Sequence, residues 1–177
     1  MDATQLPAWD QAGLALAHAV RVPWLDGVFL VVTWFGSLAV LLPLALLVWW
    51  RRRGERSAVF VALALIGASA LGHLIKLIVA RPRPDLFPPL IPMPEDWSFP
   101  SAHALQVTAF ALAWLLRPGT APGRIEIVVF LAAVALVFAS RLYLQVHFPS
   151  DVVAGAMLAS LWVLLLRRLP AWREATQ

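Results

Sequence analysis

The 177-residue chain contains no cysteine, which excludes disulfide bonds, thiol nucleophiles and thiolate metal sites. Charged residues are also scarce: they make up 14% of the chain, against about 25% in a typical soluble domain. Apolar residues reach 61%, and the mean hydropathy is +0.78. Because the alternating pattern of membrane β-strands is missing as well, the sequence predicts an all-α integral membrane protein. At this length we expect a single domain over residues 1–177.

Five long apolar runs predict membrane-spanning helices. They cover residues 25–50, 57–80, 101–116, 125–140 and 151–166. Gly36 and Pro43 are candidate bends in the first run. Seven prolines within residues 81–100 predict an irregular loop between the second run and the third.

The segment 8–20 predicts a shorter, amphipathic helix that mixes Leu14 with Asp10 and His18. At about 1.5 Å per residue it is too short for a hydrocarbon core of about 30 Å, so residues 1–22 are expected to lie on the membrane interface. If residues 6–22 crossed the membrane instead, the chain would have six transmembrane helices rather than five. Met1–Thr4 lacks a basic leader, so no cleavable signal peptide is expected.

Arginine marks one side of the membrane. Nine of the thirteen arginines lie at 51–56, 117–124 and 167–173, and threading five spans places these segments on one face. The positive-inside rule makes that face cytoplasmic, so the loops at 81–100 and 142–150 face the periplasm or exterior of a bacterial-type inner membrane. Because the basic residues cluster at the ends of apolar runs, the net charge of +4 indicates membrane topology and not nucleic-acid binding.

The segment 140–151 combines a cation, an imidazole and a carboxylate in Arg141, His147 and Asp151. Pro149 suits the first turn of a helix but not its interior, so a helix is predicted to begin there. Asp151 then lies in that first turn, folded back towards His147. A carboxylate on one imidazole nitrogen fixes the tautomer and leaves the other nitrogen free to attack or to take a proton.

Two more polar clusters are predicted on the same face. Lys76, the only lysine of the chain, and Arg83 flank the end of the second apolar run. Ser101, Ala102 and His103 open the third run, where free amide groups and the helix dipole favour an anion. Each has an ordinary alternative: a snorkelling lysine, an arginine on lipid headgroups, a structural histidine.

For several nearby residues the ordinary interpretation is favoured. Arg81 is expected to contact lipid headgroups. His73 lies three residues before Lys76 on the same helical face, so a supporting role beside the site is open, but a buried, hydrogen-bonded histidine is favoured. Asp85, Glu95 and Asp96 show no ligand spacing beside the histidines, so no metal or other cofactor is predicted.

Together the three clusters predict a cage for a tetrahedral anion, with the two histidines approaching from opposite sides. In-line phosphoryl transfer needs this arrangement, because it requires a nucleophile, a charge-neutralising cage and a proton donor for the leaving oxygen.

The clusters resemble the three signature motifs of the type 2 phosphatidic acid phosphatase (PAP2) superfamily. The match covers residues 76–151 in order and spacing, as Lys76-x6-Arg83-Pro84, Pro100-Ser101-Ala102-His103 and Ser140-Arg141-x5-His147-x3-Asp151. Ala102 stands where the family pattern usually has glycine, so the backbone is expected to approach phosphate less closely.

The resemblance implies a helical core like that of the PAP2 enzymes and the vanadium haloperoxidases, and it implies a role for each motif residue. His147 would be the nucleophile that forms a phosphohistidine, Asp151 would orient it, and His103 would protonate the leaving oxygen. Without a metal, the phosphate would be bound by Lys76, Arg83, Ser101, Arg141 and the amide of Ala102 or His103. A chain this apolar argues against the soluble haloperoxidase branch.

The expected activity is hydrolysis of a long-chain lipid phosphate or diphosphate, with membrane lipids as the only other partners. By family analogy undecaprenyl diphosphate comes first, followed by phosphatidylglycerol phosphate and phosphatidic acid. A lipid phosphotransferase is the alternative enzyme. From other classes, a transporter would want ionisable groups near the midplane, and a non-catalytic scaffold would not need every motif residue. The oligomeric state stays open.

Overall fold

The computed structural model describes residues 6–52 and 55–173 and is helical over them, without strands, so the all-α prediction is confirmed. The interpretations of Met1–Thr4 and Arg53 lie outside the described residues. In chain order the helices are α1 (Ala8–Ala19), α2 (Pro23–Val32), the 3-10 helix η2 (Thr33–Gly36), α3 (Leu38–Arg51), α4 (Arg56–Val79), α5 (Ala102–Leu115), α6 (Arg124–Tyr143), α7 (Pro149–Arg168) and α8 (Pro170–Arg173).

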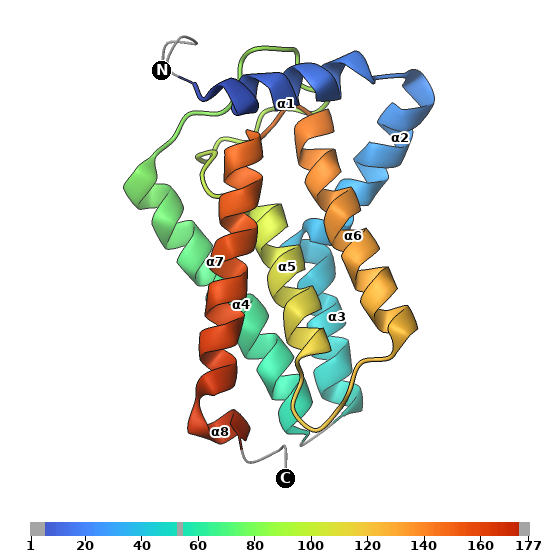
Figure 1. Ribbon diagram of the computed structural model, residues 1–177, viewed down its shortest axis with the longest axis vertical. Helices are drawn as coiled ribbons and strands as arrows, with labels where there is room; N and C mark the ends of the chain where they lie inside the picture. The colour runs from blue at the N-terminus through green and yellow to red at the C-terminus, as the bar shows by residue number, and fades with distance from the viewer. Residues whose placement is uncertain (1–5, 53–54, 174–177) are drawn as a thin grey trace.

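Helix α5 is the centre of the bundle (Figure 1). It packs against α4, α6 and α7 and also meets α3, and eight of its 14 residues are buried. The outer helix α6 buries only four of its 20 residues, and exposes Ile125, Val128 and Leu131. An apolar helix that remains exposed uses lipid as its solvent, so α6 faces the bilayer while α5 fills the core.

The membrane-spanning helices follow the predicted runs with one bend. Among the described residues, α4, α6 and α7 are each long and apolar enough to cross a membrane, and α2–η2 with α3 forms a fourth span if the pair is counted as one. The pair bends by 48°. Gly36 lies at this bend, where an added Cβ would come within 2.6 Å of Val137 Cγ1 and 3.1 Å of His103 Cβ. Pro43, the other candidate bend, lies inside α3.

Helix α5 is short for a membrane span. Its 14 residues measure about 21 Å, less than a hydrocarbon core of about 30 Å. It begins well below the ends of α6 and α7, and the loop before it fills the remaining depth (Figure 1). The motif at Ser101–His103 is therefore recessed into the bundle.

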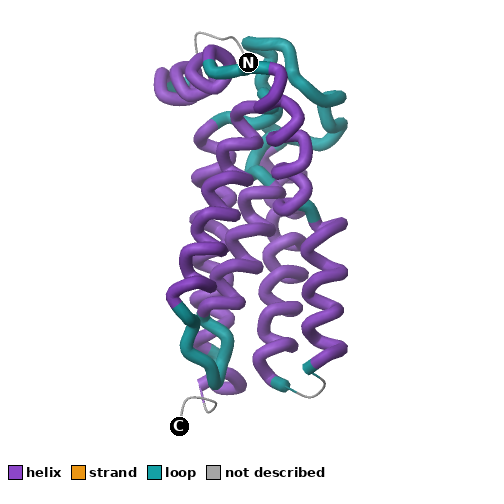
Figure 2. The backbone as a smooth tube through the Cα atoms, turned by 90° about the vertical axis from the view of Figure 1, so that its right-hand side faces the viewer, coloured by secondary structure: helices purple, strands orange, loops and turns teal. Residues whose placement is uncertain are grey.

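The two ends of the bundle carry different segments. Helix α1 and the loops at 80–101 and 144–148 lie at one end, and the α5–α6 turn and α8 lie at the other (Figures 1 and 2). This is the threading that the sequence predicts. Helix α1 lies across the end of the bundle and not along it (Figure 2).

The contact between α5 and α7 depends on Gly155. An added Cβ would lie 2.8 Å from the Ser101 carbonyl oxygen and 3.2 Å from the Leu105 amide nitrogen.

We predict that Gly155→Ala destabilises the protein by about 1–3 kcal/mol, because the backbone of α5 has to move, and that it lowers the melting temperature in detergent. The control is Gly27→Ala, where an added Cβ meets nothing within 4 Å and helix propensity favours alanine by about 1 kcal/mol. Equal melting temperatures for wild type and Gly155→Ala would contradict this contact.

Candidate active site

Asp151 is fixed from every side at the start of α7. Pro149 is the first residue of that helix, as predicted, and Asp151 is completely buried. One carboxylate oxygen accepts from the Phe148 amide at 2.9 Å and from the Ser98 hydroxyl. The other oxygen accepts from Arg81 Nη1 at 2.7 Å. With these partners the carboxylate has a single orientation, which faces His147.

His147 has two chemically different sides. Its Nδ1 lies 3.5 Å from Asp151 Oδ2 and 3.4 Å from Ser98 Oγ, whereas its Nε2 lies 3.2 Å from Arg83 Nη1. Burial lowers the pKa of His147 well below its usual value, and the charges of Arg141, Arg83 and Lys76 lower it further. A lowered pKa favours the neutral imidazole, and the carboxylate beside Nδ1 with the Arg83 donor beside Nε2 favours the tautomer that carries its proton on Nδ1.

Lys76 and Arg83 hold an anion between them, and that anion is Asp96. Lys76 Nζ lies 3.0 Å from Asp96 Oδ2, and Arg83 Nη2 lies 2.5 Å from Asp96 Oδ1. Partial burial raises the pKa of Asp96, but the hydrogen bonds from Lys76 and Arg83 outweigh it and leave that pKa below its usual value. The Asp96 side chain is still 51% exposed, whereas both cations are almost buried.

The remaining motif residues contribute groups without partners. Ser101 Oγ and Arg141 Nε are buried and have no hydrogen-bond partner in the described part of the chain. Another guanidinium nitrogen of Arg141 donates to Thr33 Oγ1 of η2, which holds the side chain across the bundle. His103 lies in the first turn of α5, close enough to Arg141 and Arg83 to interact electrostatically with both guanidinium groups. The structure thus gathers all three predicted clusters at one end of α5.

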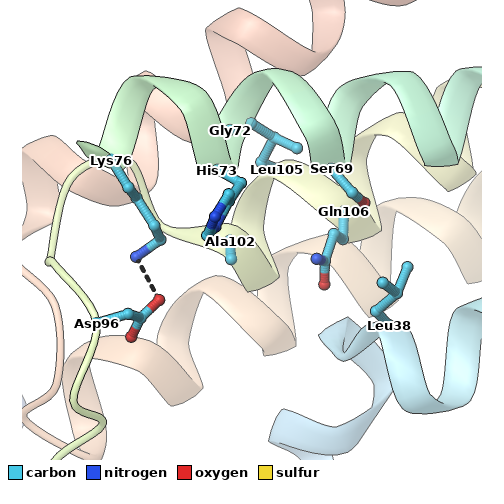
Figure 3. A pocket seen from close by; sticks show the side chains of 9 residues that line it. All are labelled: Leu38, Ser69, Gly72, His73, Lys76, Asp96, Ala102, Leu105 and Gln106. Carbon is cyan, nitrogen blue, oxygen red and sulfur yellow. Dashed lines mark ion pairs between the residues drawn. The ribbon is translucent and has the colours of Figure 1, made fainter. Parts of the chain in front are cut away.

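A cavity of about 340 Å³ opens beside the anion site, between α3, α4 and α5 (Figure 3). Lys76 and Asp96 lie at one end of it and Leu38 at the other, and Ala102 forms part of the wall (Figure 3). His73 was predicted to be buried, and that is wrong: it is exposed and lines this cavity. It lies three residues before Lys76, so both side chains leave the same face of α4.

The prediction that Arg81 contacts lipid headgroups is wrong. Its side chain is only 13% exposed and pairs with Asp151 at 2.7 Å and with Asp10 of α1 at 2.9 Å. The sequence contains a signal for this placement. Arg81 and Arg83 alternate with prolines, which favour an extended backbone, and alternate residues of an extended segment point to the same side.

Three further residues of the site belong to no sequence motif that could have identified them. Ser98 and Asp96 lie in the proline-rich loop, and Asp10 lies on the polar side of an amphipathic helix. Their importance depends on loop placement, which spacing along the chain does not specify. In the described residues no group of three or more His, Cys, Asp or Glu side chains is arranged to hold a metal ion.

Comparisons with known proteins agree on the family. The model of the PAP2 superfamily matches residues 57–175. An undecaprenyl-diphosphatase of Sulfolobus acidocaldarius is 33% identical over 150 residues, which are 82% of this chain and 70% of that protein. A decaprenylphosphoryl-5-phosphoribose phosphatase of Mycobacterium tuberculosis is 43% identical over 96 residues, 52% of this chain and 50% of that protein.

A solved structure agrees in fold as well. The crystal structure of a transmembrane PAP2 type phosphatidylglycerolphosphate phosphatase from Bacillus subtilis superposes with a TM-score of 0.78 at 26% identity, covering 94% of this chain and 86% of that one. The family model spans more than half of the chain and includes all three motifs. The chain therefore belongs to the PAP2 superfamily and is a membrane lipid phosphatase, a phosphoric ester hydrolase that works without a metal.

Proposed function

We propose that this lipid phosphatase removes phosphate from a long-chain lipid phosphate or diphosphate through a phosphohistidine, and that undecaprenyl diphosphate is its preferred substrate. One observation carries the mechanism: an anion lies between Lys76 and Arg83, and Arg83 Nη1 also lies 3.2 Å from Nε2 of His147. A phosphate in the place of that anion would have the nucleophile beside it.

The proposed reaction has two steps. His147 Nε2 attacks the phosphorus and the bond to the leaving oxygen breaks, which is the lipid oxygen of a monophosphate or the bridging oxygen of a diphosphate. His103, which is protonated when the anionic substrate is bound beside it, gives that oxygen its proton. Water, deprotonated by His103, then attacks the phosphorus, and the bond to Nε2 breaks to release inorganic phosphate. Asp151 keeps the proton of His147 on Nδ1 during the first step and stabilises the charged ring that results.

The proposed phosphate cage uses the groups that lack partners. Ser101 Oγ and Arg141 Nε are buried donors without acceptors in the described part of the chain, and such groups are costly unless a ligand satisfies them. With Lys76, Arg83 and the amide of Ala102 or His103 they would surround a tetrahedral anion, and the helix start at α5 adds its dipole.

We predict from this assignment that His147→Ala and His103→Ala each abolish phosphate release, by more than about a thousandfold, while the protein stays folded in detergent. His147→Ala should also lose the covalent phosphoenzyme, which is trapped with labelled substrate under alkaline conditions because a phosphohistidine hydrolyses in acid. Vanadate, which can adopt the five-coordinate geometry of the transition state, should inhibit the wild type in the presence of excess EDTA. An undiminished phosphoenzyme in His147→Ala would assign the nucleophile to another residue.

The Asp96 carboxylate occupies the position that we assign to substrate phosphate. It is anionic, it pairs with the same two cations, and it is the exposed member of the group. Substrate therefore has to displace it, and its competition weakens the binding of any anion to Lys76 and Arg83.

We predict that Asp96→Asn tightens inhibition by inorganic phosphate by roughly three- to tenfold, because about 1 kcal/mol of competing ion pairing is lost. The inhibition constant is measured at neutral pH, where the wild-type carboxylate is ionised. The matched control is Asp85→Asn, which removes an exposed acid from the same loop and should leave the constant unchanged. A weaker phosphate inhibition in Asp96→Asn than in wild type would assign Asp96 to binding and not to competition.

The preference for a polyprenyl substrate rests on the relatives. Two of them, the undecaprenyl-diphosphatase and the decaprenylphosphoryl-5-phosphoribose phosphatase, are named for polyprenyl lipids. A glycerolipid such as phosphatidylglycerol phosphate or phosphatidic acid is the second candidate. Three polar side chains favour it, since Ser69, His73 and Gln106 line the cavity beside the anion site and can hydrogen-bond a glycerol backbone. Phosphate release from a panel of purified polyprenyl and glycerolipid phosphates in detergent distinguishes the two.

Other functions receive less support. Transfer of the phosphoryl group to an acceptor other than water uses the same intermediate, and the lipid panel detects it as loss of substrate without free phosphate. A transporter would place its ionisable groups near the middle of the membrane. Here the ion pairs join the end of α4, the loop before α5 and the start of α7, and these segments lie at one end of the bundle (Figure 1). A scaffold has no need for Ser101 Oγ and Arg141 Nε to stay unpaired.

We also propose that the site opens on the non-cytoplasmic side of the inner membrane. The argument is the arginine count, because the segments at 51–56, 117–124 and 167–173 lie at the end of the bundle opposite the site, as far as the described residues extend.

Single cysteines introduced into this cysteine-free chain test the orientation. We predict that an impermeant thiol reagent added to intact spheroplasts labels Asp85→Cys and spares Ala121→Cys. Both positions are exposed and lie at opposite ends of the bundle. Reagent added after permeabilisation is the control that both thiols react. Labelling of position 121 alone in intact spheroplasts would place the site in the cytoplasm.

A further inference from the structure

Helix α1 is attached to the loop that carries the nucleophile by more than apolar packing. Gly13 lies so close to Pro149 that an added Cβ would come within 2.5 Å of its Cγ. The carbonyl oxygen of Leu14 accepts from Gln145 Nε2 at 3.0 Å. Gln145 and Leu14 are both fully buried. These contacts fix α1 at the start of α7. A helix that served only as an anchor on the membrane interface would need no such specific partners in the bundle.

The most specific of these contacts is ionic. Asp10 of α1 is completely buried. It accepts from the Ser150 amide at 2.8 Å, from the Ser150 hydroxyl at 2.6 Å and from Arg81 Nη2 at 2.9 Å. A buried carboxylate costs several kcal/mol unless a charge and hydrogen bonds compensate it, so Asp10 and the cation that it contacts depend on each other.

That other charge is Arg81, which lies between two buried carboxylates. Its Nη2 bonds Asp10, and its Nη1 bonds Asp151 at 2.7 Å and Ser150 Oγ at 2.6 Å. Its guanidinium carbon lies 4.1 Å from the centroid of the Phe148 ring. The guanidinium group of Arg81 is thus held by two carboxylates, a hydroxyl and an aromatic ring. Its hydrogen bonds go to Asp10, Asp151 and Ser150 and not to the anion site of Lys76 and Asp96.

We propose that the Asp10–Arg81–Asp151 bridge makes Asp10 and Arg81 positioning residues of the reaction: α1 sets the orientation of Asp151, and through it the tautomer of His147. This inference rests on the proposed function of His147 as nucleophile. Without Arg81, one oxygen of Asp151 would be a buried charge without a partner, and the carboxylate would rotate to find one. Nδ1 of His147 would then lose the acceptor that keeps its proton away from Nε2.

If the bridge positions Asp151, its loss slows the attack of His147 on phosphorus and leaves phosphate binding unchanged. A purely structural role would weaken both. We expect Asp10→Asn and Arg81→Lys to lower kcat with the best lipid of the panel by roughly ten- to a hundredfold, with KM and the inhibition constant of inorganic phosphate within about twofold of wild type. Lysine keeps the charge, but its ammonium group cannot span both carboxylates as the fork does. The double variant should be no slower than Arg81→Lys alone, because Asp10 acts through Arg81.

Asp26→Asn is the matched control. Asp26 is also a carboxylate near this end of the chain, and it accepts from the Tyr143 hydroxyl at 2.7 Å without touching Arg81 or Asp151. Its loss should leave kcat unchanged. Melting temperature and gel filtration show that each variant is folded.

A readout that needs no turnover completes the test. The chain has four histidines, so the ring nitrogen signals of His147 in ¹⁵N-histidine-labelled protein can be assigned by their loss in His147→Ala. We expect the wild type to carry the proton on Nδ1, and Asp10→Asn and Arg81→Lys to shift part of the population to Nε2, whereas Asp26→Asn does not. An unchanged tautomer with unchanged kcat in folded bridge variants would overturn the inference, as would equal losses in kcat and in phosphate affinity. If the wild type released no phosphate from any lipid, the proposed function would fail, while the tautomer measurement would still decide on the bridge.

Discussion

The buried carboxylate of Asp151 imposes a requirement that organises one whole end of the molecule. A carboxylate taken out of water costs several kcal/mol unless charges and hydrogen bonds compensate it, and removing one member of such a pair costs roughly 3–5 kcal/mol. The compensating groups come from three separate segments. The start of α7 gives the Phe148 amide, the proline-rich loop gives Ser98 and Arg81, and α1 holds Arg81 in place through Asp10. An irregular loop and a surface helix thereby acquire fixed positions.

The neighbouring anion site has the opposite electrostatic problem. Lys76, Arg83 and Arg141 are almost buried and close enough to act on His147, so they repel one another in a poorly solvated region. Asp96 relieves this repulsion from a half-exposed position in the loop before α5. A partner at the surface of the site allows the cations to stay assembled before any ligand arrives. A permanently buried partner would make the same cluster inert.

The sequence predicted the fold class, a helix or helix pair for each of the five apolar runs and the gathering of the three motifs, because apolar composition reflects the membrane directly. Among the described residues three of these helices, or four spans with the bent pair counted as one, are long enough to cross a membrane, so the number of spans stays a prediction. Helix starts at Pro149 and Ala102 followed from local chemistry. The roles of Arg81, Ser98, Asp96 and Asp10 did not follow, since each pairs with a residue far away along the chain. Arg81 and Asp151 are separated by 70 residues, and no local rule distinguishes such an arginine from one that meets headgroups. The prediction that His73 is buried was wrong for a related reason, because neighbouring elements decide whether a helix face packs against protein or lines a cavity.

The shortness of α5 has a consequence for the fate of the products. Because this helix begins well below the ends of α6 and α7, the proposed reaction centre is recessed from that end of the bundle (Figure 1). The cavity beside it runs between α3, α4 and α5 (Figure 3), whereas the Asp96 side of the anion site is open to solvent. Phosphate and the lipid product would therefore partition into different phases as soon as they separate. Such a division dilutes each product away from the other, so recombination becomes rare without any lid or gate to prevent it.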